Sequence, residues 1–263
     1  MRPEPREKRF WIICFSLQDV WQRLGILTLF SIWLASLLLA VTLPYWRSSI
    51  EVMGLSSPNV DPVYRGDPSK PYVSFAINVD WGQEVLPAMF DVLRDHDVKG
   101  TFFVTGRWAR LYPDLVRQMV QAGHEVANHG MQHHHPKELG DWELTMLLLE
   151  NHRLLTSLVG KPALLFAPPY GEVDRRIVQT ARNLGYRTVM WTIDTIDWQE
   201  PSVETTMQRV LSKVQNGAIV LMHPKPNTVK ALPGIIEGLR RQNFQIVPVG
   251  KLLEESEANI LAP

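Results

Sequence analysis

Short apolar runs alternate with helical patterns along most of this chain, and this alternation limits the fold more than any other feature. From residue 72 onward the sequence holds seven apolar runs, and the stretches between them, such as 85–93 and 177–184, carry apolar residues at helical spacing. Repeated strand–helix alternation is typical of a parallel sheet covered by helices, either open and doubly wound or closed as a barrel. The runs expected to be strands are 72–79, 100–105, 125–129, 163–167, 187–193, 218–222 and 244–249.

The expected helix boundaries are marked by residues that suit them physically. Pro113 and Asp174 stand near helix starts, where first-turn prolines and capping carboxylates are favoured. Several helical stretches end at a glycine, which adopts the left-handed conformation that closes a helix without strain. These glycines are Gly123, Gly160, Gly185 and Gly217.

Polar residues gather where the expected strands end. In parallel α/β folds the carboxyl ends of the strands share one face, and active sites are built there. A random scatter of histidines and aspartates would not follow strand ends, so the pattern predicts a catalytic face. The residues concerned are Asn78, Asp80, Thr105, His129, Asp194 and His223.

His129 and His133 lie four residues apart, so their imidazoles can face the same point in space. Two neutral imidazoles and one carboxylate are a common zinc ligand set that leaves a coordination position open for water. Asp80, at the end of the first apolar run, is the best candidate for the carboxylate. These residues predict a metal-dependent hydrolase. The alternative is a polar barrel mouth in which the histidines are simply hydrogen-bonded.

An uncharged apolar stretch, residues 24–46, is long enough to span a bilayer. About 20 helical residues at about 1.5 Å each cover the roughly 30 Å hydrocarbon core. Positive residues concentrate before the stretch, and Arg47 alone follows it directly. We therefore expect a single-pass anchor in the cell membrane, with a cytoplasmic N-terminus and an extracytoplasmic domain. A cleaved signal peptide is the alternative.

The chain divides into five segments around this anchor. A cytoplasmic segment, 1–23, precedes the anchor, 24–46, and a linker rich in Gly, Pro, Ser and Asp, 47–71, follows it. The domain covers 72–253 and a tail covers 254–263. Basic and acidic residues balance at 27 each, so no net field favours nucleic acid. The single cysteine, Cys14, excludes an internal disulfide framework and a cysteine-based metal cluster.

Five short segments, in this order, resemble the motifs of the polysaccharide deacetylases of carbohydrate esterase family 4, the NodB-homology domain. The likeness covers about 71–253 and implies a distorted (β/α)₇ barrel. It also implies hydrolysis of acetamido groups on an N-acetylated glycan, such as peptidoglycan or a chitin-like polymer. The segments are 78–82 (NVDWG), 129–133 (HGMQH), 167–171 (APPYG), 194–198 (DTIDW) and 221–223 (LMH). A narrower likeness points to the membrane-anchored, sporulation-associated branch.

The resemblance also assigns roles to residues. Asp80, His129 and His133 would bind a divalent metal, usually zinc, with cobalt or nickel also possible. His223 would be the general acid that protonates the departing amine, helped by Asp194 or Asp197. One of these two aspartates would orient a catalytic group, and the other would bond backbone. The sugar site would be lined by Tyr170, Trp198 and Pro169, and the backbone N–H of Tyr170 would help to hold the oxyanion.

Two positions depart from the family pattern. Asn78 stands where many relatives have the catalytic-base aspartate, and Ala167 stands where they have the arginine that holds that base. An amide takes no proton at neutral pH, and general-base assistance is typically worth about 10² to 10⁴ in rate. The sequence therefore leaves two main hypotheses, an N-deacetylase and a catalytically impaired pseudoenzyme that binds glycan. A third is another metal-dependent amidohydrolase that uses the same face.

Overall fold

The computed structural model describes residue 33 and residues 61–258. Within this part of the chain, no helix is both long and apolar enough to cross a membrane. The predicted anchor, 24–46, lies outside the described residues except for Trp33. The anchor therefore stays a prediction.

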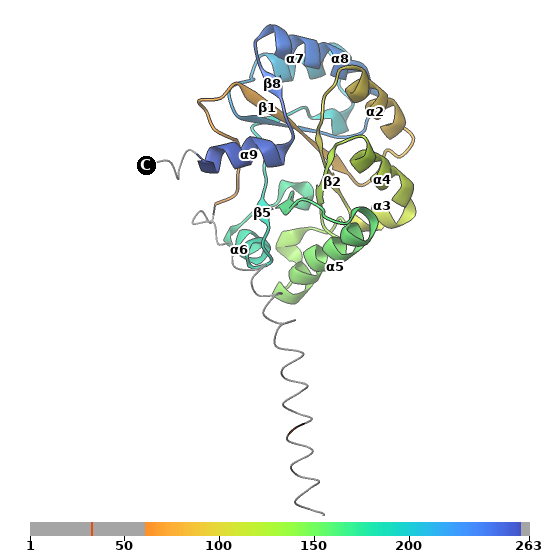
Figure 1. Cartoon of the computed structure of the whole chain (residues 1–263), viewed down its shortest axis with the longest axis vertical. Helices are drawn as coiled ribbons and strands as arrows, with labels where there is room; N and C mark the ends of the chain where they lie inside the picture. Colours follow the sequence, from red (N-terminus) through yellow and green to blue (C-terminus); the bar gives the residue numbers. More distant parts are fainter. Residues whose placement is uncertain (1–32, 34–60, 259–263) are drawn as a thin grey trace, which may run out of the picture. The chain divides into compact units, whose positions relative to one another are not determined.

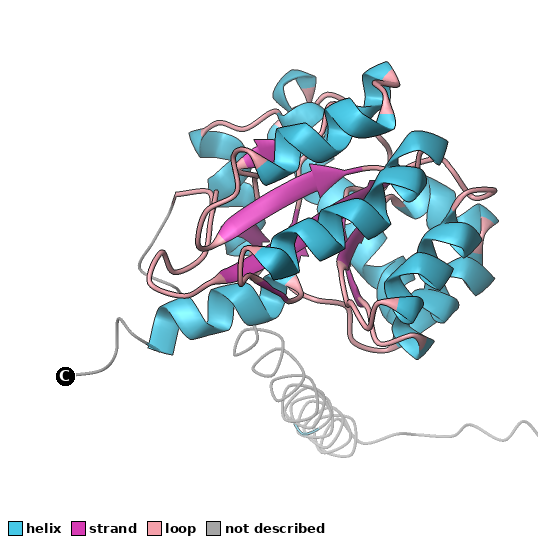
Figure 2. Ribbon diagram, turned by 90° about the horizontal axis from the view of Figure 1, so that it is seen from above, coloured by secondary structure: helices cyan, strands magenta, loops and turns pink. Residues whose placement is uncertain are grey.

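Eight strands form one parallel sheet in the order β5-β4-β3-β2-β1-β7-β6, and β8 pairs with the start of β1. Figure 2 shows these strands in the middle of the domain with helices around them. The parallel α/β fold predicted from the alternation is confirmed. The strands are β1 (Tyr72–Val79), β2 (Thr101–Val104), β3 (Glu125–Asn128), β4 (Leu165–Phe166), β5 (Arg187–Thr188), β6 (Ile193–Asp194), β7 (Ala218–Met222) and β8 (Gln245–Ile246).

The helices follow the strands in sequence and cover the sheet (Figure 1). They are α2 (Leu86–Asp95), α3 (Gly106–Leu111), α4 (Pro113–Gln121), α5 (Asp141–Val159), α6 (Arg175–Asn183), α7 (Val203–Leu211), α8 (Pro226–Arg241) and α9 (Val249–Ala258). Three short 3₁₀ turns lie in loops, η1 (Pro136–Glu138), η2 (Pro169–Gly171) and η3 (Asp197–Gln199).

Most of the predicted helix signals are confirmed by the structure. The Asp174 side chain caps α6 by accepting a 2.8 Å hydrogen bond from the Ile177 amide. Pro113 is the first residue of α4. The four glycines predicted at helix ends all have positive φ angles, between 76° and 81°, but Gly217 lies in the loop before β7 and not at the end of α7 (Val203–Leu211). Local backbone chemistry therefore sets most of the boundaries between helices and strands.

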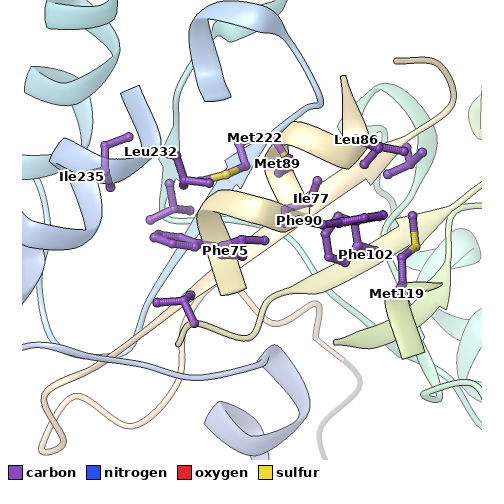
Figure 3. Close-up of a cluster of buried hydrophobic side chains, with 14 of the residues drawn as sticks. Phe75, Ile77, Leu86, Met89, Phe90, Phe102, Met119, Met222, Leu232 and Ile235 are labelled. Atoms are coloured by element: carbon purple, nitrogen blue, oxygen red, sulfur yellow. The ribbon is translucent and has the colours of Figure 1, made fainter. Parts of the chain in front are cut away.

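The side chains of β1 alternate between two apolar clusters. Phe75 and Ile77 face the covering helices, where they share a cluster with Met89 of α2 (Figure 3). Ala76 faces the other way and packs with Phe103 of β2 in a smaller inner cluster. Because successive strand residues point to opposite faces, the inner column of β1 continues through Asn78 to Asp80. This column leads from the inner core to the polar end of the sheet.

One predicted strand is two strands in the structure. The run 187–193 divides into β5 and β6, which lie at the two ends of the sheet order although only four residues separate them. Residues 189–192 therefore cross from one edge of the sheet to the other. The two edges do not pair directly with each other as strands, so the barrel expected from the family resemblance is open between β5 and β6.

The segment 61–71, which we call the strap, takes part in the domain. It belongs to the region predicted to be a linker, yet Val63 bridges Val189 and Arg65 bridges Ala218. The Val63 amide donates to the Thr188 carbonyl, and the Gly66 amide donates to the Gly217 carbonyl, each at 2.8 Å. The strap therefore supplies backbone hydrogen bonds at the gap between the two sheet edges.

Candidate functional site

The carboxyl ends of four neighbouring strands bring predicted site residues to one place, which we call the mouth. Asp80 follows β1, Thr105 follows β2, His129 follows β3 and His223 follows β7, and these four strands are consecutive in the sheet order. The Thr105 hydroxyl bonds Asp80 at 2.7 Å, and the rings of His129 and His133 lie 5.1 Å apart, so side chains from separate strand ends meet here. The strand-end pattern in the sequence thus corresponds to a real cluster.

One side of the mouth is built on Asp197, which is 1% exposed. Its Oδ1 lies 2.7 Å from Nδ1 of His223, and its Oδ2 accepts 2.7 Å bonds from the His223 amide and the Thr228 hydroxyl. A carboxylate can only accept here, so Nδ1 of His223 carries the proton and Nε2 is left to exchange one with a ligand. This arrangement suits a general acid that is fixed in one orientation.

The two aspartates of the segment 194–198 have different hydrogen-bond partners, one a histidine side chain and the other a backbone amide, as the sequence predicted. Asp197 orients His223, whereas Asp194 accepts a 2.7 Å hydrogen bond from the backbone amide of Ile196. Ile196 has a φ of 52°, a conformation that is rare for a β-branched residue. The Asp194 bond therefore helps to hold the tight turn that delivers Asp197 to His223.

The opposite side of the mouth contains the two spaced histidines. His129 is 2% exposed, and its Nδ1 lies 2.7 Å from the Ala167 carbonyl, so this nitrogen donates and Nε2 stays unprotonated. Burial, with a smaller contribution from His133, lowers the pKa of His129 to about 3. The ring centroids of His129 and His133 are 5.1 Å apart. The spacing in the sequence therefore does bring two neutral imidazoles together.

A buried amide network supports the loop that carries these histidines. Asn128 accepts hydrogen bonds from the Gly130 amide and from Asn151 of α5, both at 2.8 Å. The Asn151 amide also donates to the Val104 carbonyl at the end of β2. Because both asparagines are fully buried, these bonds fix the histidine loop against β2 and α5.

Asp80 is engaged by a residue that the sequence analysis did not single out. Its Oδ1 accepts a 2.7 Å hydrogen bond from the Thr105 hydroxyl and a 2.6 Å bond from Nε of Arg107. The Nη2 group of Arg107 bonds the second oxygen, so the guanidinium and the carboxylate form a two-pronged ion pair. Burial alone would raise the pKa of Asp80, but the hydrogen bonds from Arg107 and Thr105 outweigh it and hold the pKa below its usual value.

The residues at the mouth, as arranged, do not fit the metal that the resemblance implies. In residues 61–258 and at residue 33, no three His, Cys, Asp or Glu side chains are grouped so that they could hold a metal ion. Both oxygens of Asp80 are engaged by Arg107, so a metal at that carboxylate would first have to displace the arginine. The assignment of Asp80, His129 and His133 as ligands of zinc, cobalt or nickel stays a prediction.

The two positions that depart from the family pattern lie below the mouth. Asn78 is 6% exposed, and its Oδ1 has no hydrogen-bond partner among the described residues. On the inner face of β1 it is one step deeper than Asp80. Ala167 is 4% exposed and packs in the inner apolar cluster. Neither side chain offers an ionisable group to the mouth, as the sequence predicted.

Aromatic side chains form the rim of the mouth. The Trp81 ring stacks on His223 with centroids 5.5 Å apart, and Lys225 lies 4.7 Å from the centre of the Trp81 ring. Tyr170 stacks on His135 at 3.8 Å and also contacts His133.

Three residues, Tyr170, Trp198 and Pro169, were predicted to line a sugar site. Trp198, next to Asp197, is 53% exposed, and Tyr170 is 56% exposed. Pro169 is buried instead, so it shapes the η2 turn and offers little contact surface. Tyr170 has a φ of 58°, and such strained non-glycine residues tend to cluster at functional sites.

Arg107, Trp81 and Lys225 are the mouth residues that sequence reasoning missed. Trp81 lies inside the segment 78–82, but nothing in the sequence shows that its ring stacks on His223. Arg107 follows Thr105 by two residues, and this nearness to a strand end is the signal that could have identified it.

The parallel barrel, the His223–Asp197 pair and the five ordered segments define a carbohydrate-active hydrolase fold, and a family comparison agrees. Residues 65–189 match the model of the polysaccharide deacetylase family. The chain belongs to this family, whose members are in general metalloenzymes.

The relatives include an uncharacterized protein, a deacetylase and a pseudoenzyme. The chain is 37% identical over 202 residues to an uncharacterized protein, YlxY, of Bacillus subtilis, covering 77% of this chain and 63% of that protein's length. It is 35% identical over 186 residues to a peptidoglycan-N-acetylglucosamine deacetylase of Bacillus cereus, covering 68% of this chain and 87% of that protein. A crystal structure of a CE4 family pseudoenzyme from Bacillus anthracis superposes with a TM-score of 0.72 at 38% identity, over 74% of this chain and 69% of that one. A mutant of that pseudoenzyme with restored enzymatic activity has the same TM-score at 36% identity.

Proposed function

We propose that this protein binds an N-acetylated glycan of the cell wall at the mouth and has little or no turnover. The observation that carries the proposal is the set of exposed aromatic rings around a buried polar floor. Trp81, Tyr170 and Trp198 are each more than a third exposed, although large aromatic side chains normally bury most of their surface. Rings of this kind stack on sugar faces, while the polar floor can hydrogen-bond an acetamido group.

Impaired turnover follows from what the floor lacks. The described residues assemble no three-ligand metal group, and Asn78 and Ala167 leave the family's base and arginine positions without charge. The similarity to a pseudoenzyme of the same family supports this reading, as does the existence of a mutant of that protein with restored activity. The glycan is proposed to contain N-acetylglucosamine because the Bacillus cereus relative acts on that sugar.

Slow N-deacetylation is the second candidate, and the His223–Asp197 pair favours it. A protein that only binds glycan does not need a general acid such as His223, whose Nδ1 is held by the buried carboxylate of Asp197. In that reaction His223 would protonate the leaving nitrogen from Nε2, and Asp197 would stabilise the imidazolium that precedes this transfer. Retention of this pair keeps the enzyme hypothesis open to experiment.

Glycan binding can be tested with the full-length chain and a tetramer of N-acetylglucosamine. We expect Trp198→Ala to weaken binding about fivefold in isothermal titration, since an aromatic stacking contact is worth about 1 kcal/mol. Trp142→Ala is the matched control, because Trp142 is 73% exposed on α5 and has no part in the rim. Equal affinity of wild type and Trp198→Ala would contradict the proposed binding face.

Turnover can be tested by acetate release from the same tetramer and from muropeptides, with Asn78→Asp measured beside wild type. Acetate release by Asn78→Asp but not by wild type supports the proposal that the wild-type protein has little or no turnover. Comparable release by both would show that Asn78 is no handicap and would establish the deacetylase instead.

We also propose that residues 24–46 anchor the protein in the cell membrane with the domain outside the cytoplasm. The positive residues before this stretch support the orientation. The full-length chain should stay in the membrane pellet after alkaline carbonate extraction, and its domain should be digested by protease added outside spheroplasts. Recovery in the soluble fraction would contradict the anchor.

A further inference from the structure

Arg107 is fixed at the mouth by its backbone. It is the second residue of α3, and its amide donates to the Met131 carbonyl at 2.8 Å, while the Gly106 amide donates to the Gly130 carbonyl at 3.0 Å. A Cβ on Gly106 would clash with the Met131 sulfur, so a larger residue would require the Met131 side chain to move. The start of α3 is therefore locked to the histidine loop.

The Arg107 side chain then reaches from this fixed point across the floor. Its guanidinium bonds both oxygens of Asp80, whose side chain is 6% exposed, while the arginine itself is 48% exposed. It also lies near enough to His133 and Tyr170 to interact with them electrostatically. The positive charge therefore lies against the buried carboxylate while the arginine side chain stays half exposed to solvent.

The ion pair leaves part of the guanidinium available. Two of its nitrogens, Nε and Nη2, bond Asp80, and Nη1 makes no hydrogen bond to any residue that the structure describes. An arginine has five N–H donors and no acceptor, and it stays charged at any physiological pH. Its outer donors therefore suit an oxygen ligand that enters from solvent.

We infer that Arg107 is the resident cation of the mouth and takes the place of a metal ion there. The first part of the inference is that Arg107 neutralises Asp80 and prevents that carboxylate from binding a metal. The second part is that its outer N–H groups donate to the acyl oxygen of a bound ligand, either an acetamido carbonyl or a carboxylate. The second part rests on the proposed glycan binding, whereas the first part stands on the Asp80–Arg107 contact alone. Glycan binding is then independent of metal.

The glycan arm of the test uses the full-length chain and the N-acetylglucosamine tetramer, titrated once in EDTA and once in zinc chloride. We expect wild type to bind equally in both. Arg107→Ala should bind at least tenfold more weakly in both, since a hydrogen bond from a charged donor is worth about 10- to 100-fold. Arg107→Lys should fall between them, because lysine keeps the charge but loses the fork. Arg110→Ala, an exposed arginine on the same helix, is the matched control and should equal wild type.

The zinc arm measures zinc affinity directly, with no glycan present. Removal of the guanidinium frees Asp80, so Arg107→Ala should bind zinc at least tenfold more tightly than wild type and Arg110→Ala. Circular dichroism and thermal melting show whether each variant is folded, and Arg107→Lys provides a second variant if Arg107→Ala is not.

Each outcome separates this inference from the proposed function. If wild type binds the tetramer but Arg107→Ala binds it equally well, the role of Arg107 is wrong and glycan binding stands. Loss of wild-type binding in EDTA would also overturn it, because the site would then need metal. If no variant binds the tetramer, the proposed function and the acyl-oxygen contact fail together. Equal zinc affinity of wild type and Arg107→Ala overturns the metal-excluding role.

Discussion

The two sides of the mouth each hold a buried carboxylate, but they hold it in different ways. Asp197 is bound by three donors, two from His223 and one from Thr228 of α8, and the His223 side chain is only 17% exposed. Asp80 is bound by the Thr105 hydroxyl and by a guanidinium that is 48% exposed. The first carboxylate belongs to a closed network, whereas the second depends on one long side chain that solvent can reach.

This difference indicates which half of the mouth is held by a buried network and which half solvent can reach. The closed network keeps the geometry of a proton donor, and breaking it would leave a buried charge without partners. The open side keeps two neutral histidines but has a guanidinium beside its carboxylate.

The largest expected effect comes from the joint between the two sides, Gly82. Its φ is +88°, and an added Cβ would lie 2.5 Å from the carbonyl oxygen of Pro224, the residue after His223. Gly82→Ala should lower the free energy of unfolding by about 4 kcal/mol, since strain and a backbone clash act together. Gly160→Ala, also at positive φ but with nothing within 4 Å, should lower it by only about 1 kcal/mol. Equal urea midpoints for the two variants would show that the joint is not tight.

The second prediction compares the two carboxylates directly. Asp197→Asn should lower the free energy of unfolding by about 3 kcal/mol, because an amide N–H₂ would face donors in a buried site. Asp80→Asn should lower it by only about 1 kcal/mol, since its main partner is half exposed and solvent can compensate. Urea denaturation of both variants measures the difference. A larger loss for Asp80→Asn would reverse the comparison.

The third prediction concerns the loss of folding stability at low pH, which we expect to arise at a residue outside the mouth. His124, at the other end of β3, is 5% exposed, and burial lowers its pKa to about 4 from an ordinary value near 6.5. The unfolded chain therefore takes up the proton first, so stability falls as the pH drops from about 6.5 to about 4. His124→Gln removes this group and should reduce the loss over that window by about 2 kcal/mol. Urea midpoints at pH 7 and pH 4 test this, and an unchanged pH dependence would place the sensitivity elsewhere.

Much of the fold could be predicted because it depends on local rules. Leu86, Met89, Phe90 and Leu93 repeat at helical spacing, and all four are buried in α2. The division of 187–193 could not be read from the sequence, because hydropathy does not show that the chain crosses between sheet edges there. The role of the strap was missed for a similar reason, since its pairing partners, such as Val189, are far away along the chain.

The site shows the same limit. Spacing was enough to bring His129 near His133, and a strand end was enough to place His223. Arg107 reaches an aspartate 27 residues away through the fold, and a lone arginine carries no spacing signal. Long-range ion pairs of this kind depend on how elements pack, and packing is what a single sequence shows least.

The strap has a mechanical consequence for a domain tethered from its N-terminal side. Tension applied at residue 61 reaches the Val63 hydrogen bonds to Thr188 and Met190 before it reaches β1. The next bonds along the line of pull are that of the Thr192 hydroxyl to the Tyr64 carbonyl and that of Gly66 to Gly217. Because these few bonds lie at the gap between the sheet edges, a pull would peel the strap and open the barrel at this seam while the β1–β2 pairing stays intact.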